Sequence, residues 1–344
     1  MSRREALGRA AGLGLVLGVR GQRAQAQSSA VPSWPTELRR LAPNVYGYIQ
    51  AGGPGVPSLS VSNAGVIVGD DHVLIVDSLG APLHAKAFIA AIRREVPTKP
   101  FGRLVLTHHH GDHIEGNQYF APPAEIVGHE YCREAMLAAP PPRQPKWEKH
   151  EGWADGTEDH KILPPVTTLT DKITYHYGNM VVEVIANAPA HTWGDLMVYL
   201  PQSKVLFAGD LAFHYVAPFA FNGHVTKWLA AVDRIMKMDV DVIVPGHGPI
   251  GGKKELAEMG QYFEILKSEA RKRFDAGITA GRAAAEIQMG RFEQWLGAPE
   301  RMVMNVHRLY QEFSGTLTPE ADFPGMQATA VEYGKIKGVP PRFF

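Results

Sequence analysis

Four histidines and an aspartate crowd into one short stretch, Thr107-His108-His109-His110-Gly111-Asp112-His113. Neutral imidazole and carboxylate are ligands that zinc and related transition metals prefer. The stretch follows the apolar run 104–106, a pattern typical of a buried strand. Side chains that leave the rigid end of a strand can be aimed at one point, so the stretch predicts a metal site. A solvated histidine-rich turn is the alternative, and it loses weight once candidate ligands farther along the chain are counted.

Three more candidate ligands occur later in the chain, each next to an apolar run. His191 stands in Pro-Ala-His-Thr, Asp210 ends the run Val-Leu-Phe-Ala-Gly-Asp, and His247 stands in Pro-Gly-His-Gly. Apolar runs bounded by glycine and proline indicate strands that end at these positions. We therefore expect the three side chains on one rim of a sheet structure, beside the first cluster.

Short apolar runs and amphipathic segments alternate along the chain, which indicates an α/β fold rather than a helical bundle. In the first half, strands are expected over 45–50, 58–62, 64–68, 73–76, 104–106 and 125–128, and helices over 81–96, 115–120 and 130–138. In the second half, strands are expected over 167–169, 173–177, 181–185, 196–200, 205–210 and 240–244, and a helix over 225–238. Gly-Asp-Asp at 69–71 predicts a hairpin turn.

The ordered series His-x-His-x-Asp-His, Pro-Ala-His-Thr, Gly-Asp and Pro-Gly-His-Gly resembles the metallo-β-lactamase superfamily of hydrolases over about 45–249. The resemblance implies an αβ/βα sandwich with metals at one edge between two sheets. It also implies that the first metal is held by His108, His110 and His191, the second by Asp112, His113 and His247, with Asp210 bridging both. His109 lies between two of these ligands and is expected to point away.

The implied cofactor is a pair of zinc ions per chain. The positive charge of two divalent ions exceeds the negative charge of two carboxylates. The site is therefore positive overall, and it attracts and ionises a bridging water. Zinc-bound water can have a pKa of about 7, so a hydroxide nucleophile is available at neutral pH. The resemblance implies that Asp112 binds metal and also orients this hydroxide, which makes it the candidate catalytic residue. No side-chain nucleophile is required.

The expected activity is hydrolysis of a small-molecule ester, lactone or related electrophile, because an aspartate like Asp210 is typical of thioesterases and lactonases of this superfamily. A β-lactamase or a hydrolytic dehalogenase on the same site is the alternative, and a metal-binding protein without catalysis is the non-enzyme alternative. Lys plus Arg and Asp plus Glu each total 35. The chain therefore has no net positive charge that would favour binding to nucleic acid. Cys132 is the single cysteine, which excludes a disulfide framework.

Four residues outside the series are weaker candidates. Asp77 follows the run 73–76 and either braces the histidine stretch through a hydrogen bond or caps the next helix. His214, His224 and Trp228 either line the pocket or serve as ordinary structural residues. The sequence leaves these alternatives open.

The first 26 residues predict an export signal. Arg3 and Arg4 precede an apolar segment over 11–19 that is too short to span a bilayer, and Ala-Gln-Ala at 24–26 resembles a cleavage site. Adjacent arginines resemble a twin-arginine signal, which predicts the export machinery as a partner, a periplasmic location and no stable membrane insertion after processing. An ordinary N-terminal helix is the alternative.

Two domains are expected after the signal, a metal-binding domain over 27–250 and a helical extension over 251–344 packed on the sandwich. Helices are expected over 255–276, 280–289 and 301–313. The polar segment 143–163 has little periodicity, so it is either a lid over the site or a structural excursion.

Overall fold

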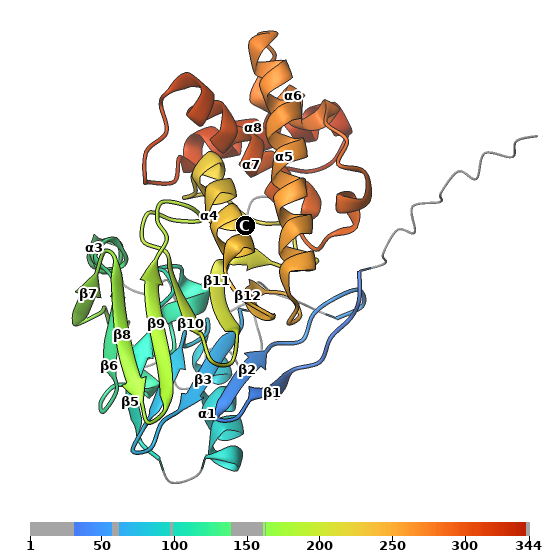
Figure 1. Ribbon diagram of the computed structural model, residues 1–344. Helices are drawn as coiled ribbons and strands as arrows, with labels where there is room; N and C mark the ends of the chain where they lie inside the picture. The colour runs from blue at the N-terminus through green and yellow to red at the C-terminus, as the bar shows by residue number, and fades with distance from the viewer. Residues whose placement is uncertain (1–30, 57–61, 97–98, 139–160, 162, 342–344) are drawn as a thin grey trace, which may run out of the picture. The chain divides into compact units, whose positions relative to one another are not determined.

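The computed structural model describes residues 31–56, 62–96, 99–138, 161 and 163–341. These residues belong to one compact unit that contains two β-sheets (Figure 1). The first sheet has the order β1-β2-β3-β4-β5-β6-β7, and the second has the order β12-β11-β10-β9-β8. The strands are β1 (Glu37–Ala42), β2 (Val45–Ile49), β3 (Ala64–Val68), β4 (Val73–Val76), β5 (Phe101–Val105), β6 (Glu125–His129), β7 (Thr167–Leu169), β8 (Lys172–Tyr177), β9 (Met180–Ala186), β10 (Leu196–Leu200), β11 (Val205–Phe213) and β12 (Val242–His247).

The first sheet changes from antiparallel to parallel pairing along its width. Strands β1 to β4 pair antiparallel, and β4 to β7 pair parallel, with α1 (Pro82–Glu95) and α3 (Glu130–Ala138) in the crossovers. Parallel strands place their carboxyl ends at the same edge. The residues that follow β4 and β5, including Asp77 and His108, therefore meet at one edge.

The second sheet is an antiparallel meander from β8 to β11, closed by β12. Strands β11 and β12 are parallel and are joined through α4 (Val225–Lys237). Because their carboxyl ends point the same way, Asp210 and His247 come to one rim of this sheet.

The two sheets face each other across a shared core, and helices cover their outer faces. Along β3 and β4, Ile67 and Leu74 join the core cluster shared with the second sheet, whereas Val66 and Ile75 join a separate cluster with Phe88 of α1. Side chains alternate between the faces of a strand, so each buried strand supplies both clusters. This arrangement is the expected αβ/βα sandwich.

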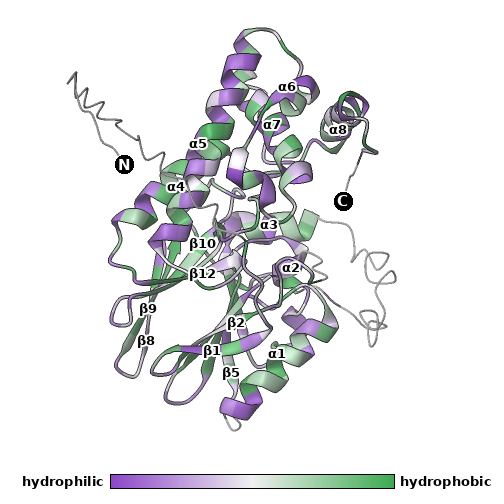
Figure 2. Ribbon diagram, turned by 90° about the vertical axis from the view of Figure 1, so that its right-hand side faces the viewer, coloured by the Kyte–Doolittle hydropathy of each residue, from purple (hydrophilic) through white to green (hydrophobic). Residues whose placement is uncertain are grey.

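The helices after β12 continue the core that the two sheets share. They are α5 (Lys253–Asp275), α6 (Ala280–Glu286), α7 (Ala298–Ser314) and α8 (Phe323–Lys337). Buried side chains of α5, including Met259 and Phe263, belong to the same cluster as β11 and β12. Figure 2 shows α5 and α7 at the opposite end of the strands from α1. The expected helical extension is therefore packed on the sandwich.

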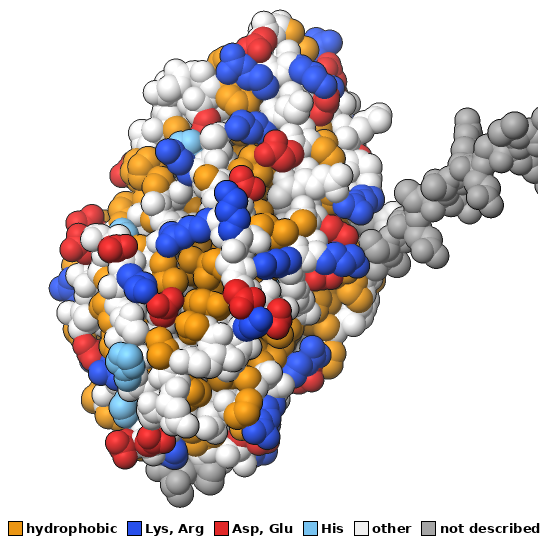
Figure 3. All heavy atoms as spheres, viewed as in Figure 1, with side chains coloured by type: hydrophobic (Ala, Val, Ile, Leu, Met, Phe, Trp, Pro, Cys, Tyr) orange, Lys and Arg blue, Asp and Glu red, His pale blue; other side chains and the backbone are white. Residues whose placement is uncertain are grey.

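The surface carries charges of both signs. On the face shown in Figure 3, basic and acidic side chains are interspersed over the sheets and the C-terminal helices. This pattern agrees with the balanced totals of basic and acidic residues. Within the described residues, no helix combines the length and the apolarity needed to cross a bilayer.

Several expected elements were wrong or displaced. Strand β1 and helix α8 were not expected. The helix expected over 115–120 is replaced by α2 (Gly111–Ile114) and a 3-10 turn (Asn117–Tyr119). The signal segment, most of the strand expected over 58–62 and most of the segment 143–163 lie outside the described residues.

Candidate metal centre

The first group of candidate ligands is a triad of imidazoles whose ring nitrogens converge. His108 Nε2 lies 3.0 Å from His110 Nδ1, and His191 Nε2 lies 2.9 Å from the same His110 atom. His108 and His110 follow β5, whereas His191 comes from the loop between β9 and β10. The carboxylate of Asp210 completes the group, with Oδ2 3.1 Å from His191 Nε2. Segments far apart in sequence thus aim four donor atoms at one point.

The second group consists of Asp112, His113 and His247. His247 Nε2 lies 3.2 Å from Asp112 Oδ2, and His113 Nε2 lies 3.7 Å from the same oxygen. Asp210 stands between the groups, because its Oδ1 is 3.1 Å from His113 Nε2 while its Oδ2 faces the first group. The structure therefore brings all seven predicted ligands together in the two predicted sets.

The donor chemistry of this cluster fits metal ions. His113 Nε2 and Asp210 Oδ1 are fully buried and lie 3.1 Å from each other, but their contact lacks hydrogen-bond geometry and neither has another hydrogen-bond partner among the described residues. Leaving a buried polar atom unsatisfied costs about 1–3 kcal/mol. Ring nitrogens here lie about 3 Å apart beside two carboxylates, and among the described residues no lysine or arginine makes an ion pair with those carboxylates. Such a cluster is satisfied only by cations or protons bound within it. Imidazole and carboxylate suit zinc and its neighbours.

Asp77 orients two of the candidate ligands. Its Oδ2 accepts hydrogen bonds from His113 Nδ1 and from the Thr107 hydroxyl, each at 2.8 Å. The Thr107 oxygen in turn lies 3.1 Å from His108 Nδ1 and can accept its proton. Fixing the proton on Nδ1 leaves the Nε2 lone pairs of His108 and His113 directed into the cluster. Asp77 therefore acts as the brace.

The alternative role of Asp77 as a helix cap is wrong. Helix α1 has Ala81 at its N-cap, without a side-chain hydrogen bond. Asp77 itself adopts a left-handed backbone with φ of 61°. Few residues other than glycine adopt this conformation, and aspartate is among those that tolerate it best. The backbone turns sharply here, and the buried carboxylate faces Thr107 and His113.

Asn222 orients a third ligand, and sequence patterns did not reveal it. Its Oδ1 lies 3.2 Å from His110 Nε2, and its Nδ2 donates to the carbonyl of Pro319 at 2.9 Å. Since that second bond fixes the amide orientation, the oxygen accepts the His110 proton and leaves Nδ1 free for the cluster. Pro319 lies between α7 and α8, so the C-terminal extension supports the site directly.

Neither ligand group contains the other residues considered from the sequence, His109, His214 and Trp228. His109 belongs to neither group and packs edge-on against Tyr131. His214 is fully buried, and its Nδ1 donates to the carbonyl of Pro249. Trp228 donates to the Leu211 carbonyl and lies 4.9 Å from the His191 ring, so it supports that ligand. Neither His214 nor Trp228 is part of either ligand group.

Burial and carboxylates shift the cluster pKa values in opposite directions. Burial lowers the pKa of His108 and of His110, which keeps both rings neutral and able to donate a lone pair. Burial also disfavours a charged His113, but Asp210 and Asp112 outweigh it and raise the pKa of His113. Neighbouring histidines overcome burial and lower the pKa of Asp210. The cluster therefore presents ionised carboxylates that require positive charge.

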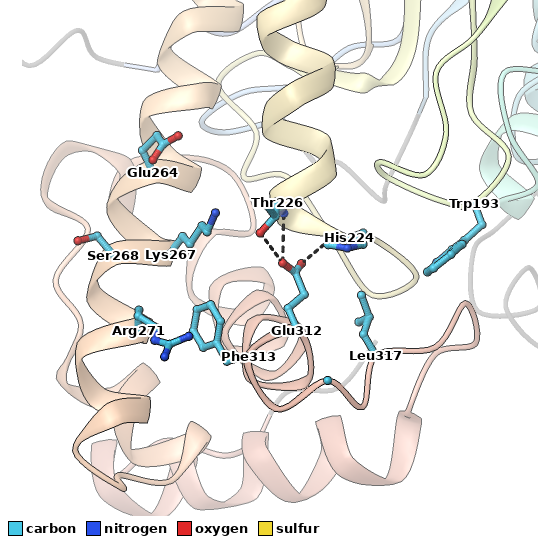
Figure 4. A pocket seen from close by; sticks show the side chains of 11 residues that line it. Trp193, His224, Thr226, Glu264, Lys267, Ser268, Arg271, Glu312, Phe313 and Leu317 are labelled. Atoms are coloured by element: carbon cyan, nitrogen blue, oxygen red, sulfur yellow. Dashed lines mark hydrogen bonds and ion pairs between the residues drawn. The ribbon is translucent and has the colours of Figure 1, made fainter.

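A separate pocket of about 700 Å³ lies beside the C-terminal helices (Figure 4). Trp193 and His224 line one side, and Lys267, Arg271 and Phe313 line the other. Glu312 hydrogen-bonds Thr226, and its Oε1 lies 3.3 Å from His224 Nδ1. No residue of either ligand group lines this pocket, so it is not the site of the metal chemistry. The predicted pocket role of His224 belongs to this second cavity.

A family comparison agrees with the geometry of the cluster. The model of the metallo-β-lactamase superfamily matches residues 58–247, which contain all seven residues of the two groups. The chain belongs to the metallo-β-lactamase superfamily. Its metal-site residues therefore occur in the superfamily's hydrolase framework, and α5 to α8 follow the matched region.

Curated relatives of this superfamily member carry different activities in their names. The chain is 26% identical to the 2,4-dinitroanisole O-demethylase subunit alpha of Nocardioides sp., over 53% of this chain and 51% of the relative. It is 29% identical to the hydroxyacylglutathione hydrolase of Brucella anthropi, over 53% and 59%. It is 26% identical to the metallo-β-lactamase type 2 of Bacillus cereus, over 63% and 78%. The chain spans about half the length of the first two relatives.

Solved structures share the fold of this superfamily member. A stereoselective inverting sec-alkylsulfatase from Pseudomonas sp. aligns with a TM-score of 0.61 and 18% identity, over 89% of this chain and 55% of that one. A metallo-β-lactamase from Pontibacter korlensis aligns with a TM-score of 0.52 and 20% identity, over 66% and 99%. At these identities the likeness concerns the fold alone.

Proposed function

We propose that the chain is an exported dinuclear zinc hydrolase that acts on a small-molecule ester, thioester, lactone or related electrophile. The observation that carries the proposal is the position of Asp210, whose carboxylate lies 3.1 Å from His113 of one ligand group and 3.1 Å from His191 of the other. A carboxylate between two triads suits a pair of divalent ions better than a single one. The similarity to a hydroxyacylglutathione hydrolase supports thioesters and esters as substrates.

Two zinc ions bound by these groups would supply a water nucleophile that is ionised near neutral pH, together with positive charge for the developing oxyanion. The chain's own residues prepare this chemistry. Asp77, Thr107 and Asn222 hold protons on the outer nitrogens of three ligand rings, so the inner lone pairs stay available. Asp112 has 28% of its side chain exposed, against 4% for Asp210. Asp112 is therefore the carboxylate placed to orient a water and accept its proton.

Elemental analysis of the purified protein tests the metal part of this proposal. We expect close to two zinc ions per chain in the wild type, and Asp210→Ala should lose metal and most activity. His110→Ala should lose metal, whereas His109→Ala should retain it, because His109 lies outside both groups. Equal metal loss in these two histidine variants would contradict the assignment. If the purified protein instead contained stoichiometric iron that changes oxidation state, electron transfer would replace hydrolysis as the proposed function.

A substrate panel tests the reaction. It should contain lactones, thioesters, aryl esters, sulfate esters, phosphodiesters, β-lactams and chlorinated aromatics, assayed with zinc-loaded protein. We expect cleavage of carboxylic esters or thioesters, with a rate that falls as pH drops through the titration of the nucleophile. Sulfate esters are the second candidate, because the chain is 23% identical to a linear primary-alkylsulfatase of Pseudomonas sp.. Cleavage of phosphodiesters alone would rule out both.

Export has its own test. The supporting observation is the order of Arg3 and Arg4, the short apolar segment and Ala24-Gln25-Ala26. A fusion of residues 1–30 to a folded reporter should reach the periplasm only in cells with a working twin-arginine system. Replacing both arginines with lysine should retain the reporter in the cytoplasm. Retention of the unaltered fusion would contradict periplasmic export.

A further inference from the structure

Helix α7 carries two buried arginines with very different surroundings. Arg301 and Arg308 are seven residues apart, about two helical turns, so they point from the same side of the helix. Arg301 is 8% exposed and Arg308 is fully buried. Burying a guanidinium is costly unless its donors and its charge are satisfied. The two residues therefore need separate explanations.

Arg308 is a structural arginine with its donors used. It hydrogen-bonds the carbonyls of Gly223, Thr318 and Glu320 and the side chain of Gln311. A guanidinium has about five N–H donors, and five hydrogen bonds are made here. These contacts tie the loop before α4 to the loop before α8. Arg308 therefore has a structural role, which is to hold these two loops together.

Arg301 leaves most of its hydrogen-bond donors unused. It makes one hydrogen bond, from Nη1 to the carbonyl of Ala217 at 2.7 Å. No carboxylate lies within ion-pair distance of Arg301 in the part of the chain that the structure describes, and its Nε and Nη2 are without acceptors there. Neither nitrogen is among the fully enclosed atoms that lack partners, so both border accessible space. A buried cation with unused donors is suited to bind a ligand.

Aromatic rings connect Arg301 to both ligand groups. Its Cζ lies 5.8 Å from the Phe213 ring, which stacks on His247 at 4.9 Å. The same Cζ lies 5.7 Å from the Phe219 ring, which contacts Phe221 at 4.6 Å. Phe221 stacks in turn on His110. Because Phe213 also lies 5.9 Å from the His191 ring, Arg301 is one ring away from both groups.

The charge of Arg301 acts on the centre from this position. Burial lowers the pKa of Arg301, and the charges of Asp210 and Asp112 act in the opposite direction. Divalent ions at the centre would more than cancel both carboxylates. Arg301 would then add positive charge to a site that is already positive, so its counter-charge must come from elsewhere.

We infer that Arg301 binds an oxyanion of the substrate, which makes the substrate of this site a small anionic amphiphile with an apolar body and one carboxylate or sulfate group. This inference rests on the proposed function for the reaction and on Arg301 for the substrate class. The planar guanidinium matches oxyanions in a two-point geometry. Phe219 and Phe221, which are only partly buried, supply aromatic surface for the apolar body.

Calorimetric binding tests the inference without any turnover. Zinc-loaded wild type would be titrated with hexanoate, hexanesulfonate and neutral hexanamide, and so would Arg301→Met. We expect the variant to lose about 10-fold or more in affinity for at least one anion, because it loses a charge-assisted hydrogen bond, and to keep its hexanamide affinity within about twofold. The metal ions contribute alike to both proteins, so the difference belongs to Arg301.

Controls separate recognition from structure. Lys267→Met removes a cation that lines the separate pocket and should leave all three affinities unchanged. Arg301→Lys keeps the charge but loses the planar fork, and it should lose about threefold or more for the favoured anion even if Arg301→Met does not fold. A larger loss for hexanoate would identify a carboxylate, and a larger loss for hexanesulfonate a sulfate.

Two outcomes would overturn the inference. One is unchanged anion affinity in both Arg301 variants, and the other is a wild type that binds hexanamide as tightly as either anion. The hydrolase proposal fails separately, because a protein that binds the anions through Arg301 but cleaves no member of the substrate panel would keep the anion site and lose the reaction.

Discussion

At the scale of single residues, the spacing of donors identifies the ligands, whereas the orientation of each donor comes from residues that no motif marks. His108, His110, Asp112 and His113 are close in sequence because one loop must supply both groups. No motif marks Asn222 or Arg301 as part of a site, and only long-range packing brings them near the cluster. The motif series and the family resemblance could therefore predict the seven donors and offer Asp77 as a brace, but they could not predict the support from Asn222.

Asp77 gives the first prediction at this scale. Asp77→Asn keeps the shape but replaces an ionised acceptor with a neutral amide, so the Nδ1 protons of His108 and His113 are held less firmly. Loss of such an outer partner costs about 10- to 100-fold in metal affinity or activity. We expect a loss of this size in zinc affinity, measured by competition with a chromophoric chelator. Asp71→Asn, at an exposed turn position, is the control and should bind zinc like the wild type.

At the scale of elements, the fold was predictable where hydrophobic period and turn chemistry agreed. Strands β3, β4, β7 and β10 have their expected bounds, and the turn after β3 forms a hairpin. Strand β1 was missed because Glu37–Ala42 is half exposed at a sheet edge and shows little apolar alternation. Helix α8 was missed because its apolar residues do not form one stripe and Gly325 and Gly334 interrupt it. Tertiary contacts, rather than local sequence patterns, determine that β1 and α8 form.

The close pairing of β11 and β12 gives a prediction at this scale. A Cβ added at Gly246 would overlap Asp210 Oδ1 and crowd the backbone of Gly209. Gly246→Ala should therefore displace the Asp210 carboxylate and lower zinc content in both groups, measured by elemental analysis. Gly260→Ala in α5 is the matched control, because its Cβ would meet only the Val232 side chain at 3.3 Å. Since alanine favours a helix over glycine by about 1 kcal/mol, that control should keep its zinc and its stability. Full zinc occupancy in Gly246→Ala would show that a Cβ at this position does not displace the Asp210 carboxylate.

At the scale of the whole molecule, the metal centre lies where two sheets and the C-terminal extension meet. The first sheet supplies the loop after β5, and the second supplies Asp210 and His247. The extension supports His110 through Pro319 and Asn222, and it holds the loop before α4 through Asn305, which hydrogen-bonds Ala220 and Pro218. Metal binding is therefore coupled to the docking of all three parts.

This coupling predicts the effect of metal removal on stability. Ions that bind only the folded chain stabilise it by about 2.7 kcal/mol when free metal is at roughly 100 times the dissociation constant. For a chain of this size, chelation should lower the midpoint of thermal unfolding by roughly 4 °C for each ion, measured by scanning calorimetry. Asp210→Ala should respond far less to the same chelator, because its centre is already compromised. If the zinc-containing wild type unfolded at the same temperature before and after complete zinc removal, the cluster would not join the three parts, and Asn222 would be a packing residue of the extension alone.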